Sequence, residues 1–177
     1  MTSPPPSDAL DVLELMRAAA IARSAEDMSN VYAIDAVHEF PFAKPGVPAR
    51  AEGRDAIMSF ITAFWSTSPL RYESYRTIAI HGTADPDTIV VEQEVAGTSS
   101  TTGSFVLPNI MVLKTRHGQI AHLRDYANLL AVEEATGSPV SSASSTATPT
   151  TPPPTRPWPA GPPRSSPPSA KRSPDGP

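Results

Sequence analysis

His38 is the first residue of this chain whose type and surroundings suit acid–base chemistry. It lies in AVHEFPF, residues 36–42, where side chains alternate as in a half-buried strand. The alternation places His38 on one face with Phe40 and Phe42. An imidazole with an ordinary pKa near ~6.5 can carry protons at neutral pH, so His38 is a candidate catalytic residue. The alternative is a structural histidine at a pocket rim or hydrogen-bonded within the core.

Asp125 is the second candidate for acid–base chemistry. On the predicted strand QIAHLRDYAN, residues 119–128, it shares a face with Ala121 and Leu123. Apolar surroundings raise the pKa of a carboxyl, which could then act as an acid or a base near neutral pH. The alternative is an aspartate at the strand end that pairs with Arg124 or another arginine. In the functional interpretation, His38 and Asp125 form an acid–base pair.

Two amides, Gln93 and Asn109, interrupt the apolar faces of predicted strands. They could orient a carbonyl or hydroxyl of a ligand, or they could be satisfied by the backbone within the core. The other predicted substrate-binding residues are Phe40, Phe60, Trp65 and Met111.

The remaining titratable residues favour structural roles. Asp35 lies between a helix end and a strand, where aspartate often bonds to the backbone. Glu39 points away from Phe40 by alternation, and hence away from the predicted pocket. The sequence has no cysteine, and its other histidines and carboxylates show no metal-ligand spacing. Because it also has no Gly-rich phosphate loop and no Gly-x-Ser-x-Gly, we predict neither a metal nor a cofactor.

The elements that must position these residues follow from hydrophobic spacing and turn signals. Helices are expected over residues 8–25, 25–32 and 53–65, with a strand over residues 36–42. Four strand-like runs follow, over residues 71–82, 87–97, 103–115 and 119–128, and one helical turn is expected over residues 128–134. This order predicts an α+β fold, in which a curved, cone-shaped antiparallel sheet wraps around three N-terminal helices.

The chain divides into a folded domain, residues 8–137, and a Pro/Ser/Thr-rich tail, residues 138–177. The tail holds 13 of the 22 prolines and no leucine, isoleucine or methionine. It cannot bury enough apolar surface to offset its conformational entropy, so we predict that it is disordered. Its net charge is +3 within a whole-chain charge of −4, which leaves −7 on residues 1–137.

This charge argues against nucleic acid as a partner, because an acidic domain repels phosphates. The N-terminal stretch has no basic region followed by an apolar core, so neither a signal peptide nor a membrane span is expected. We therefore predict a cytoplasmic protein. Residues 103–115 are apolar on both strand faces, which suggests that a second copy covers the outer face of the sheet in a homodimer.

Several strings resemble the nuclear transport factor 2-like superfamily, which includes ketosteroid isomerases, SnoaL-like polyketide cyclases and phenazine-biosynthesis A/B proteins. The resemblance covers residues 8–135. The isomerase-like pattern is carried by Tyr32, Ala33, Asp35, Ala36, Glu39 and Pro41, and the helix-start pattern by GRDAIMSF, residues 53–60. The resemblance implies the cone-shaped fold with a pocket, which in this superfamily hosts many chemistries.

The isomerase residues themselves do not carry over. The positions of its general base and two oxyanion donors fall on Phe40, near Met16 and near Ile110, none of which can do acid–base chemistry. A standard ketosteroid isomerase mechanism is therefore excluded. The run from Arg124 to Asn128 instead resembles the phenazine-biosynthesis A/B proteins, whose pocket acid corresponds to Asp125.

These observations leave three hypotheses. The first is a cofactor-independent isomerase or cyclase that acts on a small apolar carbonyl compound, such as a polyketide. The second is a ligand-binding or dimeric scaffold domain without turnover. The third is an interaction protein, whose tail presents polyproline II segments to a partner.

Overall fold

The computed structural model describes residues 9–46 and 48–137. The predicted tail, residues 138–177, lies outside the described residues, and its disorder stays a prediction. The domain boundary at residue 137 likewise stays a prediction.

The described residues contain four helices, three of which precede the main strands as expected. They are α1 (Ala9–Ala22), α2 (Ala25–Val31), α3 (Arg54–Thr67) and α4 (Leu129–Thr136). Helix α1 buries Val12, Leu13 and Met16, which share one face at helical spacing. Helix α4 is longer than the single expected turn. Asn128 caps its first turn and Gly137 ends it in a left-handed conformation with φ of 69°.

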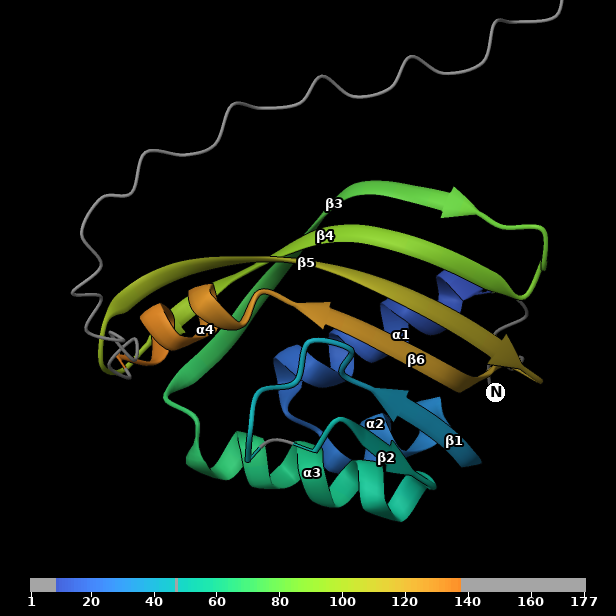
Figure 1. Ribbon diagram of the computed structural model, residues 1–177, viewed down its shortest axis with the longest axis horizontal. Helices are drawn as coiled ribbons and strands as arrows, with labels where there is room; N and C mark the ends of the chain where they lie inside the picture. Colours follow the sequence, from blue (N-terminus) through green and yellow to red (C-terminus); the bar gives the residue numbers. More distant parts are fainter. Residues whose placement is uncertain (1–8, 47, 138–177) are drawn as a thin grey trace, which may run out of the picture. The chain divides into compact units, whose positions relative to one another are not determined.

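Six strands form one sheet in the order β2-β1-β6-β5-β4-β3 (Figure 1). They are β1 (Tyr32–Glu39), β2 (Arg50–Glu52), β3 (Leu70–Gly82), β4 (Thr88–Ser99), β5 (Gly103–Arg116) and β6 (Gln119–Ala127). Strands β3 to β6 form the predicted antiparallel meander. The α+β fold class with a curved sheet beside N-terminal helices is confirmed.

The sheet departs from the expected pattern along β1. This strand pairs in parallel with β6, with His38 opposite Leu123, so the sheet is mixed. On its other side β1 pairs with the short strand β2, which lies in a segment where no strand was expected. Both pairings join segments that are distant in sequence or short, which is why alternation alone did not reveal them.

The sheet curves around α1 and α3, and α4 lies against one end of β5 (Figure 1). One glycine sits where two strands approach closely. A Cβ on Gly97 of β4 would lie 1.9 Å from the backbone oxygen of Arg71 on β3, so only glycine fits there without displacing a strand. The curvature leaves a concave face toward the helices, and this face carries the candidate site.

The outer face of the sheet is partly uncovered. Val106 and Ile110 on β5 are 56% and 44% exposed, whereas the residues that follow each of them, Leu107 and Met111, are buried. No helix within residues 9–46 and 48–137 is both long and apolar enough to cross a membrane. A cytoplasmic location stays a prediction.

Candidate functional site

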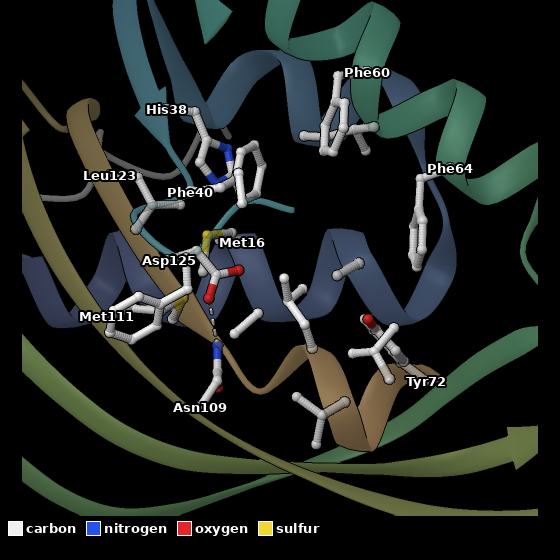
Figure 2. A pocket seen from close by; sticks show the side chains of 18 of the residues that line it. Met16, His38, Phe40, Phe60, Phe64, Tyr72, Asn109, Met111, Leu123 and Asp125 are labelled. Carbon is white, nitrogen blue, oxygen red and sulfur yellow. Dashed lines mark hydrogen bonds between the residues drawn. The ribbon is translucent and has the colours of Figure 1, made fainter. Parts of the chain in front are cut away.

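A cavity of about 370 Å³ lies between the concave face of the sheet and helices α1, α3 and α4 (Figure 2). This volume falls in the range of small-molecule sites. Its wall includes every residue that the sequence analysis named as catalytic or substrate-binding: His38, Phe40, Phe60, Trp65, Gln93, Asn109, Met111 and Asp125. The structure thus brings the eight residues together around one space, and their roles stay predictions.

Asp125 extends from β6 into this cavity and is held by a neighbouring strand. Nδ2 of Asn109 on β5 donates a hydrogen bond of 2.9 Å to Oδ1 of Asp125 (Figure 2). Burial raises the pKa of Asp125 to about 6, and the bond from Asn109 lowers this pKa in part. Asp125 therefore exchanges a proton close to neutral pH, as a carboxyl that serves as an acid or a base must do.

His38 extends from β1 and stacks on Phe40, with 4.4 Å between ring centroids. Its Nδ1 shares a hydrogen bond of 3.1 Å with the hydroxyl of Tyr32, and its buried Nε2 has no partner among the described residues. Burial, with the nearby His122, lowers the pKa of His38 to about 4. The imidazole is therefore neutral at neutral pH, whereas the sequence interpretation relied on its ordinary pKa.

The cavity residues that the sequence analysis did not name as site residues include Met16 on α1 and Tyr72 and Tyr75 on β3. Burial raises the pKa of Tyr72 to about 12 and that of Tyr75 further, and the charge of Asp125 adds to both shifts. Both phenols are therefore neutral and can donate hydrogen bonds. Tyr72 and Tyr75 both face the cavity although they are three residues apart, because a bulge between Tyr72 and Ser74 interrupts the alternation.

Arg17 supports the cavity from behind and was also missed as a site residue. It is 5% exposed, and its Nε and Nη2 donate to Oε1 of Gln93 at 3.0 and 2.6 Å. On a helix, an arginine among apolar residues predicts little about its partners, since its long side chain can reach several elements. Only the tertiary structure shows that it contacts a pocket residue.

The cavity ends between α4 and the segment that follows β1. Phe42 and Lys44 come from that segment, and Leu129, Val132 and Glu133 from α4. Lys44 and Glu133 form an ion pair that joins the two. No sequence signal pairs two residues 89 positions apart, so this contact was not predicted.

The two acids interpreted as structural do lie in surface ion pairs. Asp35 pairs with Arg116, and Glu39 pairs with Arg50 and contacts His122. Neither Asp35 nor Glu39 lines the cavity. These contacts tie β1 to its neighbours β2 and β6 and to the last residue of β5.

Comparisons with known proteins agree with this architecture. The sequence model of the SnoaL-like domain family matches residues 12–123 of this chain. The chain is 31% identical over 130 residues to YesE of Bacillus subtilis, a match that covers 73% of this chain and 87% of that protein. It is 34% identical over 110 residues to a PhzA/B-like protein of Pseudomonas aeruginosa, covering 62% of this chain and 76% of the relative.

The fold is also shared with a solved structure from Mycobacterium tuberculosis, a protein in complex with estradiol-17β-hemisuccinate. The TM-score is 0.58 at 18% identity, and the match covers 71% of this chain and 98% of that one. The resemblance to the superfamily of SnoaL-like proteins is therefore confirmed. With a family model that matches residues 12–123, this chain belongs to the SnoaL-like domain family.

Proposed function

We propose that this protein is a cofactor-independent isomerase or cyclase that acts on a small apolar carbonyl compound by moving a proton on Asp125. The observation that carries the proposal is the position of this carboxyl. It lines an apolar cavity, has a pKa raised to about 6, and is held by Asn109. A carboxyl of this kind is largely ionised at neutral pH and can still be reprotonated readily.

In the proposed reaction, Asp125 removes a proton from the carbon next to the ligand carbonyl. The electron pair of that C–H bond moves into an enolate. Return of the proton to another carbon of the conjugated system isomerises the ligand. Alternatively, the enolate carbon attacks a second carbonyl of the same molecule, forming a C–C bond, and the new alkoxide takes the proton. Neutral His38 contributes a hydrogen bond near the ligand and carries no charge.

The ligand class follows from the wall of the cavity. Aromatic rings of Phe40, Phe60, Phe64 and Trp65 make up much of this wall, and Phe40 contacts Phe60 at 4.8 Å between ring centroids. Such a surface favours fused rings over charged ligands. The M. tuberculosis protein of similar fold binds a steroid ester, which supports a polycyclic ligand here.

The proposal is tested with 2-tetralone, a bicyclic ketone whose C–H groups beside the carbonyl exchange with deuterium. We expect the wild-type protein to accelerate exchange in D₂O, measured by proton NMR, and Asp125→Asn to lose most of this acceleration. Asp35→Asn is the matched control, because Asp35 is an acid outside the cavity. Equal acceleration by wild type and Asp125→Asn would exclude Asp125 as the proton carrier.

A non-catalytic ligand-binding domain is the second candidate. It is favoured by the lowered pKa of His38, because this leaves Asp125 without a second group that titrates near neutral pH. Binding of 2-tetralone without accelerated exchange would support this candidate over the enzyme.

The proposed assembly is a homodimer through the outer face of the sheet. Val106 and Ile110 leave apolar surface on β5, in the middle of that face. Pairing with a second copy would remove this surface from water. The dimer could serve either candidate function, since it leaves the cavity on the opposite face.

A further inference from the structure

We propose that Arg17 is a positioning residue that fixes the amide of Gln93, so that its N–H₂ group faces the ligand and the site selects a carbonyl oxygen. The inference deepens the proposed function by assigning the donor that binds the ligand carbonyl. It does not require that Asp125 be catalytic.

The orientation of the Gln93 amide follows from the chemistry of its partner. Arginine carries only hydrogen-bond donors, so the Gln93 atom that Arg17 contacts twice, at 3.0 and 2.6 Å, must be the oxygen. Arg17 itself is held in place by residues of its own helix and of β3. Its Nη1 donates to Oγ1 of Thr77 at 3.1 Å and to Oε1 of Glu14 at 2.7 Å. Its guanidinium also lies 5.5 Å from the ring centroid of Tyr75.

The nitrogen of the same amide is therefore directed away from Arg17. Within the described part of the chain, its hydrogen-bond partner is Sδ of Met111 at 3.8 Å. A thioether is a weak acceptor, and one contact leaves the second N–H of the amide unused. Gln93 and Met111 line the cavity whereas Arg17 does not, so the amide runs from the arginine behind the wall to the cavity itself.

The unused donor lies in surroundings that make an acceptor valuable. Gln93 is 3% exposed, and most of the cavity wall is apolar. A buried donor without a good acceptor disfavours the empty site, and a ligand carbonyl would supply that acceptor. An apolar ligand of the same shape would leave the donor unpaired.

The place of Gln93 in the sheet relates this donor to Asp125. Gln93 on β4 lies opposite Asn109 on β5 in the strand register, and Asn109 bonds to Asp125 on β6. The Gln93 donor, the Asn109 amide and the Asp125 carboxyl thus lie on three adjacent strands of the concave face. A ketone with its oxygen at Gln93 would direct its neighbouring C–H groups along the row toward Asp125.

Substitution of Gln93→Glu separates this role from a purely structural one. Glutamate preserves an oxygen for Arg17 and replaces the N–H donor with a carboxylate oxygen. We expect thermal stability to be retained and affinity for 2-tetralone to fall about 10-fold or more. Affinity for tetralin, the hydrocarbon, should change less than about 2-fold, and the alcohol 2-tetralol should gain relative to the ketone because its hydroxyl can donate.

Dissociation constants are measured from quenching of Trp65, which lines the cavity. Arg17→Met is the second variant. It frees the Gln93 amide to turn, so we expect the wild-type preference for ketone over alcohol to decrease. If Arg17 were merely structural, its substitution would instead weaken the binding of all three compounds by a similar factor. If Arg17→Met does not fold, Gln93→Glu decides alone.

The proposal is overturned if wild type fails to bind the ketone more tightly than tetralin, or if Gln93→Glu weakens ketone and hydrocarbon equally. Asp125→Asn distinguishes this inference from the proposed function. Loss of deuterium exchange with the ketone preference intact supports both. A ketone preference in a wild-type protein that shows no exchange supports the Gln93 assignment and contradicts catalysis.

Discussion

Nδ2 of Asn109 donates a hydrogen bond of 2.9 Å to Oδ1 of Asp125, diagonally across strands β5 and β6. Asn109 lies opposite Ala127 in the register and Asp125 lies opposite Met111. The bond stabilises the ionised carboxylate against its burial, and it lowers the pKa that burial has raised. The acidity of the candidate proton carrier therefore depends on a residue of another strand.

Removal of this bond should raise the pKa of Asp125. We expect Asn109→Leu to move the pKa above about 6 and to shift the pH dependence of deuterium exchange to higher pH. The measurement is the exchange rate of 2-tetralone between pH 5 and 9. Ile110→Leu is the control, because Ile110 lies on the same strand and is partly exposed outside the cavity. An unchanged or lower pKa would show that the bond does not stabilise the carboxylate.

Burial of Asp125 should reduce stability at neutral pH. Its pKa is about 6 in the folded protein and 3.8 as an ordinary carboxyl, so between these values the folded state holds a proton that the unfolded chain releases. Stability from this group is therefore present below about pH 4 and is lost as the pH rises through 6.

Asp125→Asn should accordingly raise the free energy of unfolding at pH 7.5 by about 1–2 kcal/mol, less than the full shift implies because Asp125 is partly exposed. At pH 4 the gain should disappear. Urea denaturation at both pH values measures it, with Asp35→Asn as the control. A loss of stability at pH 7.5 would contradict the raised pKa.

His38 should produce the opposite dependence on pH. Its folded pKa of about 4 lies below its ordinary 6.5, so its contribution to stability is present above pH 6.5 and is lost as the pH falls toward 4. In wild type the two dependences partly cancel. In Asp125→Asn that of His38 remains, so we expect this variant to lose stability steadily between pH 6.5 and 4. A flat profile there would show that His38 titrates normally.

Because β3 and β4 approach closely, we predict that one added methyl group at Gly97 strongly lowers the free energy of unfolding. Gly97→Ala would place Cβ 1.9 Å from the backbone oxygen of Arg71, so the strands must separate. We expect a loss of about 3 kcal/mol or more in the free energy of unfolding, as for a severely overpacked site. Gly82→Ala on β3 is the control, since its Cβ would meet nothing within 4 Å. Similar effects of the two variants would contradict the strand geometry.

The dimer is tested on the outer face of β5. We expect sedimentation equilibrium to show a dimer for wild type and a monomer for Ile110→Lys, because a charge in the centre of an apolar interface is unpaired when buried. Leu130→Lys is the control, since Leu130 is 63% exposed on α4 rather than on the sheet. A monomeric wild type at micromolar concentration would rule out the dimer.

Local patterns predicted what depends on local geometry. Alternation around His38 and along β5 assigned the faces on which His38 and Asn109 lie, and both residues line the cavity. The bulge beside Tyr72 was not predictable in this way, because one extra residue reverses the alternation without a sequence mark.

Contacts between distant elements were also beyond the sequence. Arg17 lies 76 positions from Gln93, and nothing in either segment indicates their hydrogen bonds. The pKa of His38 could not be predicted either, since it depends on how completely Tyr32, Phe40 and the adjoining strand exclude water from the ring.

The central claim, that Asp125 is a proton carrier facing an apolar ligand, is tested most directly by its own titration. Carbon-13 NMR of the Asp125 carboxyl, assigned by comparison with Asp125→Asn, reports its pKa with and without 2-tetralone. We predict a pKa of about 6 that changes when the ketone binds. A pKa at or below 3.8, or a titration that the bound ketone leaves unchanged, would contradict the account.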